Sequence, residues 1–314
     1  MQSYVARRAL TFLITIWLAA SLSFVTLLVL PGNPARLMLG VDANPQALAA
    51  LERQLGLDAP AAVRYGRWLA GAVRFDLGSS VVYHLPVAQL IAQRLQVTLP
   101  LTGLALLLAT GLGVPLGLYA AYRRGGAADA LVSGLAQLGM ATPSFWLGIF
   151  LILVFAVRLN WLPAGGFPGW SAGASTALRA LLLPAAALGA ARAASLTRMV
   201  RAAALDVMGR DFVRTARAKG VPESRVMRRH VLRNALITIS TVLVLELGQL
   251  LAGAVIIEQV FALPGLGSLA LTAVSARDLP LTQGVVVVIA GAIVFLSFVN
   301  DVLYAYLDPR IRYS

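Results

Sequence analysis

The sequence predicts an all-α polytopic membrane protein with six transmembrane helices. Of its 314 residues, 59% are hydrophobic and only 12% are charged, and the mean hydropathy is +0.81. A bilayer core about 30 Å thick requires about 20 apolar residues per helix. Six windows meet that length: Ala9–Leu30, Val97–Tyr122, Leu131–Val157, Ala177–Val200, Leu236–Ile257 and Leu281–Leu307. The alternating segments of about ten residues that are typical of membrane β-barrels do not occur.

The residues that the chain lacks exclude several function classes. It has no cysteine, which excludes disulfides, thiolate nucleophiles and cysteine-ligated metals. Its two histidines, His84 and His230, form no H-E-x-x-H zinc motif and lie outside the predicted spans, which disfavours an intramembrane hydrolase. We expect no metal site. The net charge of +13 is attributed to cytoplasmic loops rather than to nucleic-acid binding.

Basic residues in the short loops predict that both termini are cytoplasmic. This orientation places Arg7, Arg8 and ten basic residues of Arg198–Arg233 inside, as the positive-inside rule requires. The first apolar run is too long for a signal peptide and lacks a cleavage site, so we interpret it as an uncleaved span. The expected boundaries are a cytoplasmic N-terminus at 1–8, a first helix at 9–30, and a cytoplasmic tail at 308–314.

A long extracytoplasmic segment, residues 31–96, follows the first helix. Within it, Pro45–Leu57 predicts a short helix, Phe75–Ser80 is turn-like, and Pro86–Leu95 has the spacing of an amphipathic helix that enters the second span. Residues 97–307 are expected to form a five-helix core. Small residues allow close helix packing in lipid, and the second span contains Gly103, Gly111, Gly113 and Gly117.

The most informative segment is the basic loop at 201–235. Apolar residues at helical spacing predict an amphipathic helix over Ala202–Lys219; they are Leu205, Met208, Phe212 and Ala216. Gly220 suits the left-handed end of that helix, and Pro222 suits the first turn of the next one. The second helix carries one basic ridge into the fifth span, formed by Arg225, Arg229 and Arg233. Two helices meeting at this elbow would project from the membrane; the alternative is an interfacial helix lying on anionic headgroups.

These residues resemble the cytoplasmic loop of ABC importer permeases, and more closely that of the dipeptide/oligopeptide/nickel group. The resemblance lies in Arg214-Thr215-Ala216-Arg217-Ala218-Lys219-Gly220 and His230-Val231-Leu232-Arg233-Asn234-Ala235. Relative to the general permease pattern, Arg214 replaces a glutamate and Arg233 replaces a proline, as is common in the peptide group. Further stretches similar to that group are Tyr4–Arg8, Leu30–Pro34, Asp76–Ser80, Glu258–Phe261, Leu263–Gly267 and Leu307–Arg310. The short N-terminus and long first outer loop are similar to the B-type subunit.

The resemblance implies a type I importer permease that works as half of a heterodimer. Its partners would be a second related permease, two ATP-binding cassette ATPase subunits, an extracytoplasmic substrate-binding protein and membrane lipid, in a bacterial or archaeal inner membrane. The only lysine is Lys219, followed by Gly220, so no Walker A motif is possible and this chain is not the ATPase. ATP and Mg²⁺ are therefore expected on the partners. The expected ATPase contacts are Asp211, Arg214, Thr215, Ala216, Arg217, Lys219, Gly220, His230 and Arg233.

Two further sets of residues are candidates for the transport path. Ionisable residues inside spans are costly; Glu246 and Gln249 lie on one face of the fifth span, and Arg192 in the fourth is the candidate counter-ion. The alternative for Glu246 and Gln249 is a hydrogen bond to the partner permease. In the outer loop 258–280, the resemblance implies a gate at Leu263, Pro264, Gly265, Leu266 and Gly267; an ordinary buried turn is the alternative.

The expected function is import of small peptides through a path shared with the second permease. Nickel complexes, glutathione and oligosaccharides are alternative cargoes, because related permeases serve them. Two alternatives come from other classes. An ATP-independent secondary transporter or channel would be active without an ATPase. A non-transporting scaffold would show no stimulated ATPase activity in the assembled complex.

Overall fold

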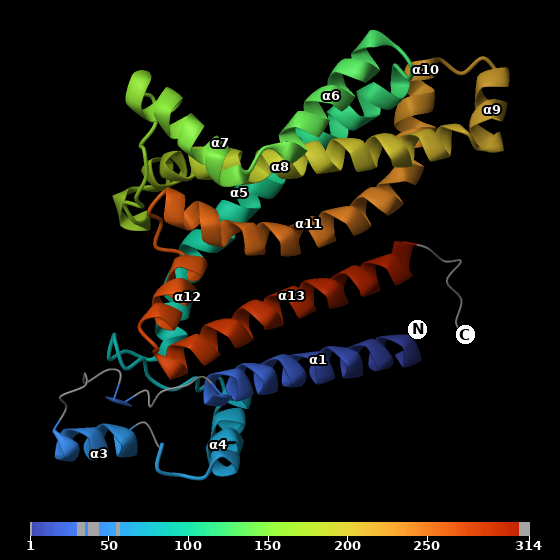
Figure 1. Ribbon diagram of the computed structural model, residues 1–314. Helices are drawn as coiled ribbons and strands as arrows, with labels where there is room; N and C mark the ends of the chain where they lie inside the picture. Colours follow the sequence, from blue (N-terminus) through green and yellow to red (C-terminus); the bar gives the residue numbers. More distant parts are fainter. Residues whose placement is uncertain (1, 30–34, 37–43, 55–56, 308–314) are drawn as a thin grey trace. The chain divides into compact units, whose positions relative to one another are not determined.

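The computed structural model in Figure 1 describes residues 2–29, 35–36, 44–54 and 57–307. These residues form helices and turns, with a single isolated β-bridge between Ser79 and Pro86 among them. The predicted tail at 308–314 and the Leu30–Pro34 stretch lie outside the described residues. The chain divides into two compact units, Met1–Gln96 with Gly265–Phe295, and Val97–Pro264 with Leu296–Ser314.

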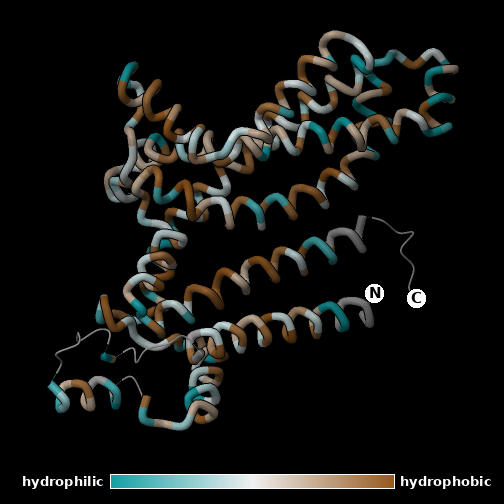
Figure 2. The backbone as a smooth tube through the Cα atoms, in the orientation of Figure 1, coloured by the Kyte–Doolittle hydropathy of each residue, from teal (hydrophilic) through white to brown (hydrophobic). Residues whose placement is uncertain are grey.

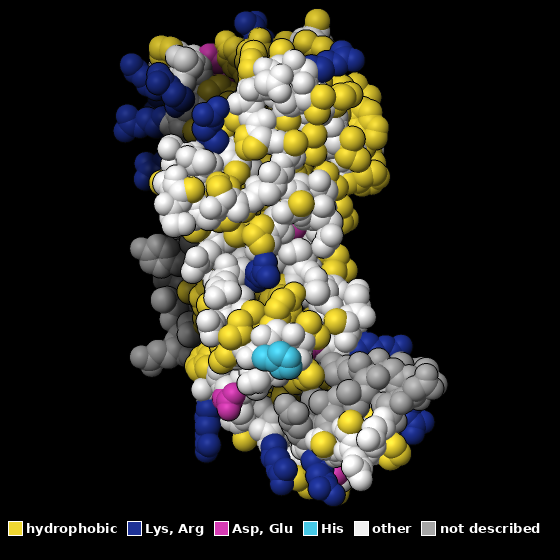
Figure 3. Space-filling model, turned by 90° about the vertical axis from the view of Figure 1, so that its left-hand side faces the viewer, with side chains coloured by type: hydrophobic (Ala, Val, Ile, Leu, Met, Phe, Trp, Pro, Cys, Tyr) yellow, Lys and Arg dark blue, Asp and Glu magenta, His cyan; other side chains and the backbone are white. Residues whose placement is uncertain are grey.

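Long apolar helices dominate the described part of the chain. Five are long and apolar enough to cross a membrane, and hydrophobic residues run along much of their length (Figure 2). They are α1 (Gln2–Val29), α5 (Val87–Tyr122), α8 (Ala174–Met208), α11 (Arg233–Val260) and α13 (Leu279–Leu307). Hydrophobic side chains also cover wide areas of the face drawn in Figure 3. An apolar surface of this extent is typical of a protein that faces lipid.

The predicted third span, Leu131–Val157, is not one straight helix. It consists of α6 (Ala127–Ala141), α7 (Ser144–Leu151) and the π-helix η1 (Ile152–Arg158), with a bend of 98° between α6 and the α7–η1 pair. Pro143 causes the break, because a proline disfavours helical geometry in the residue before it. Thr142 is accordingly extended, with φ −82° and ψ 121°. The bent pair supplies the sixth candidate span.

The first unit contains α1, α3 (Pro45–Gln54), α4 (Ala61–Val73), α12 (Leu266–Ser275) and the first parts of α5 and α13. As predicted, an amphipathic helical start leads directly into the second span: Val87, Leu90 and Ile91 are buried against α12 and α13. Asp278 is fully buried and accepts hydrogen bonds from Ser80 Oγ at 2.5 Å and from the backbone N–H of Leu281 at 3.2 Å. It thereby holds the turn after α4 and caps α13.

Helix α4 packs on α1 through aromatic side chains. Tyr65 Oη lies 2.6 Å from Ser21 Oγ, and the Phe24 ring contacts Tyr65 and Trp68 at centroid distances of 5.3 and 5.9 Å. The chain turns away from α4 at Phe75, which has a positive φ of 61°. The N–H groups of Phe75 and Asp76 donate hydrogen bonds to carbonyl groups in the last turn of α4. The expected turn at Phe75–Ser80 follows.

The second unit packs around α8, which contacts α5, α6, α7 and α11. Its two apolar clusters are centred on Leu181, Leu188 and Ile257, and on Val200, Val213 and Val231. A β-carbon at Gly117 of α5 would lie 2.6 Å from Thr197 O of α8, whereas Gly111 has nothing within 4 Å. The predicted close packing therefore involves Gly113 and Gly117, and not Gly103 or Gly111.

A short loop after η1 is fixed to the end of α11. Gly166 N–H donates to Phe261 O at 2.8 Å, and a β-carbon at Gly165 would lie only 2.5 Å from the same oxygen. Phe261 itself is fully buried. Gly165 is therefore a position where the backbone approach leaves no room for any side chain.

Candidate functional site

The basic segment at 201–235 forms two short helical pieces between α8 and α11. The predicted single helix over Ala202–Lys219 is wrong: α8 ends at Met208, Gly209 and Arg210 form a break, and α9 (Asp211–Ala218) follows. Arg210 adopts an extended conformation with ψ 150°. The returning arm consists of α10 (Glu223–Arg225) and the π-helix η3 (Val226–Leu232), which continues into α11.

The break also changes which side of α9 is apolar. Val213 and Ala216 are buried against α8 and η3, while Phe212 is 42% exposed. The expected stripe assumed an unbroken helix from Leu205 onward, so its phase is lost at Gly209. As a result, α9 presents Phe212, Arg214 and Thr215 outward.

Gly220 forms the elbow that the sequence predicted. Its φ is +74°, and two hydrogen bonds close the end of α9: Gly220 N–H to Arg217 O at 2.9 Å and Val221 N–H to Ala216 O at 3.2 Å. This pair is the Schellman pattern, in which a left-handed glycine satisfies the last carbonyl groups of a helix. Pro222 comes directly before α10 rather than inside its first turn.

An ion pair spans the elbow. Arg217 donates from Nη2 to Glu223 Oε1 at 2.6 Å and from Nε to Oε2 at 3.1 Å. These hydrogen bonds to Glu223 raise the pKa of Arg217 above its usual value. A bidentate pair of this kind fixes orientation as well as distance, so α9 and α10 are held at a defined angle.

The remaining predicted contact residues lie on the surface of the projection. Arg225, Arg229 and Arg233 are all exposed, as expected for a basic ridge, although η3 is a π-helix rather than the regular helix assumed. Lys219 is exposed and His230 is half-buried. Asp211 and Arg214 form an exposed ion pair at 3.6 Å, a type of contact that contributes little stability.

The predicted partners Arg192 and Glu246 are brought together by α8 and α11. Arg192 Nη1 lies 3.6 Å from Glu246 Oε2, and the Glu246 side chain is 8% exposed. No hydrogen bond to Glu246 Oε2 is present among the described residues. Gln249, placed on the same face by its spacing, is exposed. The pair therefore has charge complementarity without a direct hydrogen bond.

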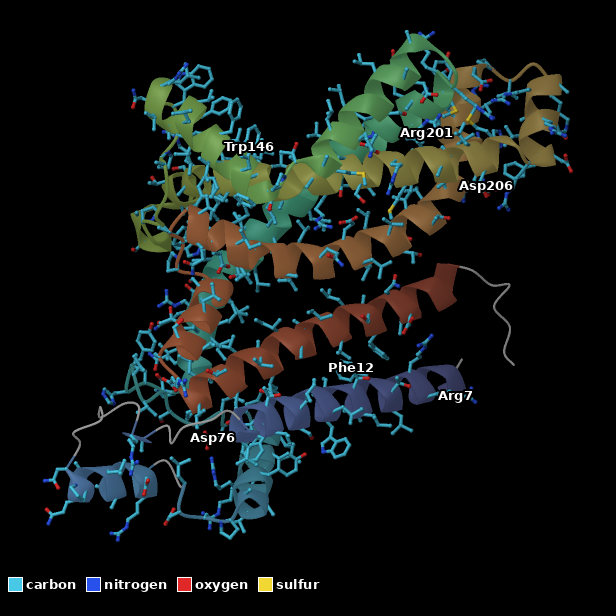
Figure 4. The ribbon with its side chains drawn as sticks, viewed as in Figure 1. Arg7, Phe12, Asp76, Trp146, Arg201 and Asp206 are labelled. Atoms are coloured by element: carbon cyan, nitrogen blue, oxygen red, sulfur yellow. The ribbon has the colours of Figure 1, made fainter. Side chains whose placement is uncertain are left out.

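A second ion pair was not predicted from the sequence. Arg201 of α8 donates from Nε and Nη2 to the two carboxylate oxygens of Asp129 in α6, at 2.6 and 2.8 Å. Gly125 N–H and Ser133 Oγ complete the set at 2.9 and 3.3 Å. Figure 4 labels Arg201 and Asp206, which lies on the same helix and forms an exposed pair with Arg210.

Glu258 is a further buried carboxylate to which the sequence analysis assigned no role. It is fully buried near the end of α11 and accepts a hydrogen bond from Thr98 Oγ1 of α5 at 2.6 Å. A signal for Glu258 was available, because the chain contains only 13 acidic residues and an acidic group beside an apolar helix requires a partner.

The predicted outer gate at Leu263–Gly267 is not a simple loop. Ala262, with φ 49°, makes the turn after α11, and Gly265 is merely extended. Leu266 and Gly267 form the first turn of α12, which lies within the expected outer loop 258–280. Leu263 and Leu266 are buried.

No group of three or more His, Asp or Glu side chains that could hold a metal ion occurs in the described part of the chain. The features that this structure offers are an exposed two-helix projection and charged pairs inside a helical membrane bundle.

Nearly the whole chain matches models of one family. Residues 113–313 match the model described as binding-protein-dependent transport system inner membrane component, and residues 1–102 match the corresponding N-terminal model. The chain therefore belongs to this family of inner membrane components.

Relatives and a solved structure support this assignment. The chain is 40% identical to a peptide transport system permease protein of Brucella abortus (strain 2308), over 100% of both chains. It is also 40% identical, over 100% of both chains, to the glutathione transport system permease protein GsiC of Shigella flexneri serotype 5b (strain 8401). A structure of the MetNI methionine ABC transporter in an inward-facing conformation covers 70% of this chain and 97% of its own, with a TM-score of 0.59 and 19% identity. The fold is thus that of an importer permease.

Proposed function

We propose that the chain is a permease subunit of an ATP-driven importer, and that its cargo is small peptides, with glutathione as a tripeptide example. Full-length similarity to peptide and glutathione permeases supports the cargo class. The observation that carries the mechanism is the two-helix projection, because its returning arm continues directly into α11 and its first arm joins α8 across the two-residue break at Gly209–Arg210.

In the proposed mechanism, the projection receives the movement of an ATPase. Phe212 and Arg214 on α9 supply an exposed aromatic and a cationic contact. The Gly220 turn and the Arg217–Glu223 pair keep the two arms at a fixed angle. A displacement of α9 therefore moves α8 and α11 together, and these helices carry the Arg192–Glu246 pair.

The proposed assembly follows from this role. A second related permease completes the path, two ATPase subunits hold ATP and Mg²⁺, and a binding protein delivers the cargo on the other side. The projection and both termini are placed in the cytoplasm, as the basic short loops indicate. Arg192, Glu246 and Gln249 are proposed to line or flank the path, and Leu263–Gly267 is proposed to face the binding protein.

The experiment is uptake of a labelled dipeptide, or of labelled glutathione, into proteoliposomes. They would contain this chain, the second permease and the two ATPases from the same source, with the binding protein added outside. We expect uptake that requires both ATP and the binding protein. Uptake by liposomes that hold this chain without any ATPase would instead identify a secondary transporter or channel, and would overturn the proposal.

A further inference from the structure

A cavity of about 310 Å³ lies in the first unit, at the ends of two spans. Phe24 of α1 and Leu279 and Pro280 of α13 line it. Phe24 lies within the last turn of the apolar span Arg7–Thr26, and Leu279 and Pro280 begin the span Leu279–Val302. Because 20 helical residues cover about 30 Å, these positions fall at the level of the lipid headgroups.

Two arginines from α4 face this cavity. Arg64 and Arg67 line it, and neither forms an ion pair with another residue in the described ranges. Asp76 also lines the cavity, but its Oδ1 already accepts a hydrogen bond from the backbone N–H of Gly78 at 3.0 Å. The cavity therefore carries an excess of positive charge and planar donors, which suit a phosphate group.

Aromatic residues of α4 place the same helix at the membrane surface. Trp68 lines the cavity, and its Nε1 is buried without a hydrogen-bond partner among the described residues. Tryptophan and tyrosine are enriched at headgroup level, where one end is apolar and the other polar. Figure 4 shows Asp76 beside the end of α1 that α4 contacts.

An apolar stripe on α1 runs down from this level. Leu18, Leu22 and Val25 recur at helical spacing, and all three are exposed in the chain. Val25 directly follows Phe24, which lines the cavity, and Leu22 and Leu18 continue the stripe away from it, so an acyl chain below a bound headgroup would lie along this stripe.

We propose that this cavity binds the phosphate of a phospholipid headgroup, held by Arg64 and Arg67, with the acyl chains along α1. The site anchors α4 to the bilayer surface. This inference goes beyond the proposed function and is independent of the cargo.

The test uses the full chain, co-purified with its partner subunits in detergent, and native mass spectrometry with added dioleoyl phosphatidylglycerol. We expect one tightly retained lipid in the unmodified protein and a fall in apparent affinity for the R64Q/R67Q variant of roughly fivefold for each arginine removed. The R53Q/R74Q variant is the matched control, because it removes two exposed arginines that do not line the cavity. It should retain the lipid as the unmodified protein does.

Dioleoylglycerol, which has the same acyl chains and no phosphate, is not expected to be retained. Equal loss of phosphatidylglycerol in both double variants, or no loss in either, would overturn the site. Retention of dioleoylglycerol would overturn phosphate recognition. Thermal stabilisation by inorganic phosphate or by dialanine, with none by phosphatidylglycerol, would show a site for a soluble anion and would likewise contradict a lipid site.

Discussion

Glu246 is a buried carboxylate whose ion-pair partner is Arg192, 3.6 Å away. We expect E246Q to destabilise the protein by about 1–3 kcal/mol, because removing one charge leaves the other uncompensated in a low-dielectric bundle. The R192Q/E246Q double variant should recover most of that loss. Thermal unfolding of the four proteins of this cycle in nanodiscs measures the coupling; additive effects of the two substitutions would contradict the pairing.

Asp129 accepts four hydrogen bonds, two of them from Arg201. Its replacement in D129N should cost about 2–4 kcal/mol, since a charge-assisted bidentate pair with a buried carboxylate is lost. The matched control is D206N, which breaks the exposed Asp206–Arg210 pair and should cost less than about 0.5 kcal/mol. Denaturant unfolding compares the two; equal losses would show that the Asp129 contact has no special role.

Sequence reasoning found one of these pairs and missed the other for a physical reason. Arg192 and Glu246 are conspicuous because each lies in the interior of an apolar window. Asp129 and Arg201 lie at the edges of theirs, where charged residues are ordinary. Their contact depends on how α6 packs against α8, and residue spacing along one helix does not contain that information.

The packing of α5 on α8 provides a prediction at the scale of elements. G117A should destabilise the protein by about 1–3 kcal/mol, because the new methyl group lies 2.6 Å from Thr197 O and overpacking forces helices apart. G111A on the same helix is the control, with open space around it. It should be neutral or stabilising by up to about 1 kcal/mol, given the helix propensity of alanine. Thermal unfolding would contradict the close approach if both variants behaved alike.

The elbow between α9 and α10 provides a second prediction. Valine at position 220 must adopt a left-handed conformation or distort the turn, so G220V should leave basal ATPase activity in the assembled transporter while uptake falls severalfold. G125V is the control: Gly125 has a similar φ of +78° and open space, but it lies outside the projection. Uptake and ATP hydrolysis measured in the same proteoliposomes decide the matter. An unchanged transport-to-hydrolysis ratio in G220V would argue against a rigid elbow.

The elements themselves were largely predictable, and their interruptions were less so. Hydrophobic runs located five spans and the amphipathic start of α5, and Gly220 located the elbow. The bend at Thr142–Pro143 was missed because proline is tolerated inside membrane helices; Pro100, Pro115 and Pro184 all lie within continuous helices here. The break at Gly209–Arg210 was missed because the apolar spacing continues across it.

At the scale of the whole molecule, the proposed orientation is open to a direct test. The chain has no cysteine, so single cysteines can be introduced without removing any. Ser224 in α10 and Ser171 in the 3₁₀ turn before α8 are both exposed. In intact cells, a membrane-impermeant maleimide should label S171C, and it should label S224C only after permeabilisation. The reverse pattern would invert the proposed topology.

The close approach between Gly165 and Phe261 has a mechanical consequence. Gly166 N–H donates to the Phe261 carbonyl, and there is no space for a β-carbon at Gly165 beside it. The loop that contains these glycines is therefore held tightly against the end of α11. A shift of the last turn of α11 would therefore move the loop at residues 159–169 with it. A methyl group added at position 165 would separate this loop from Phe261, at the end of α11 opposite the two-helix projection.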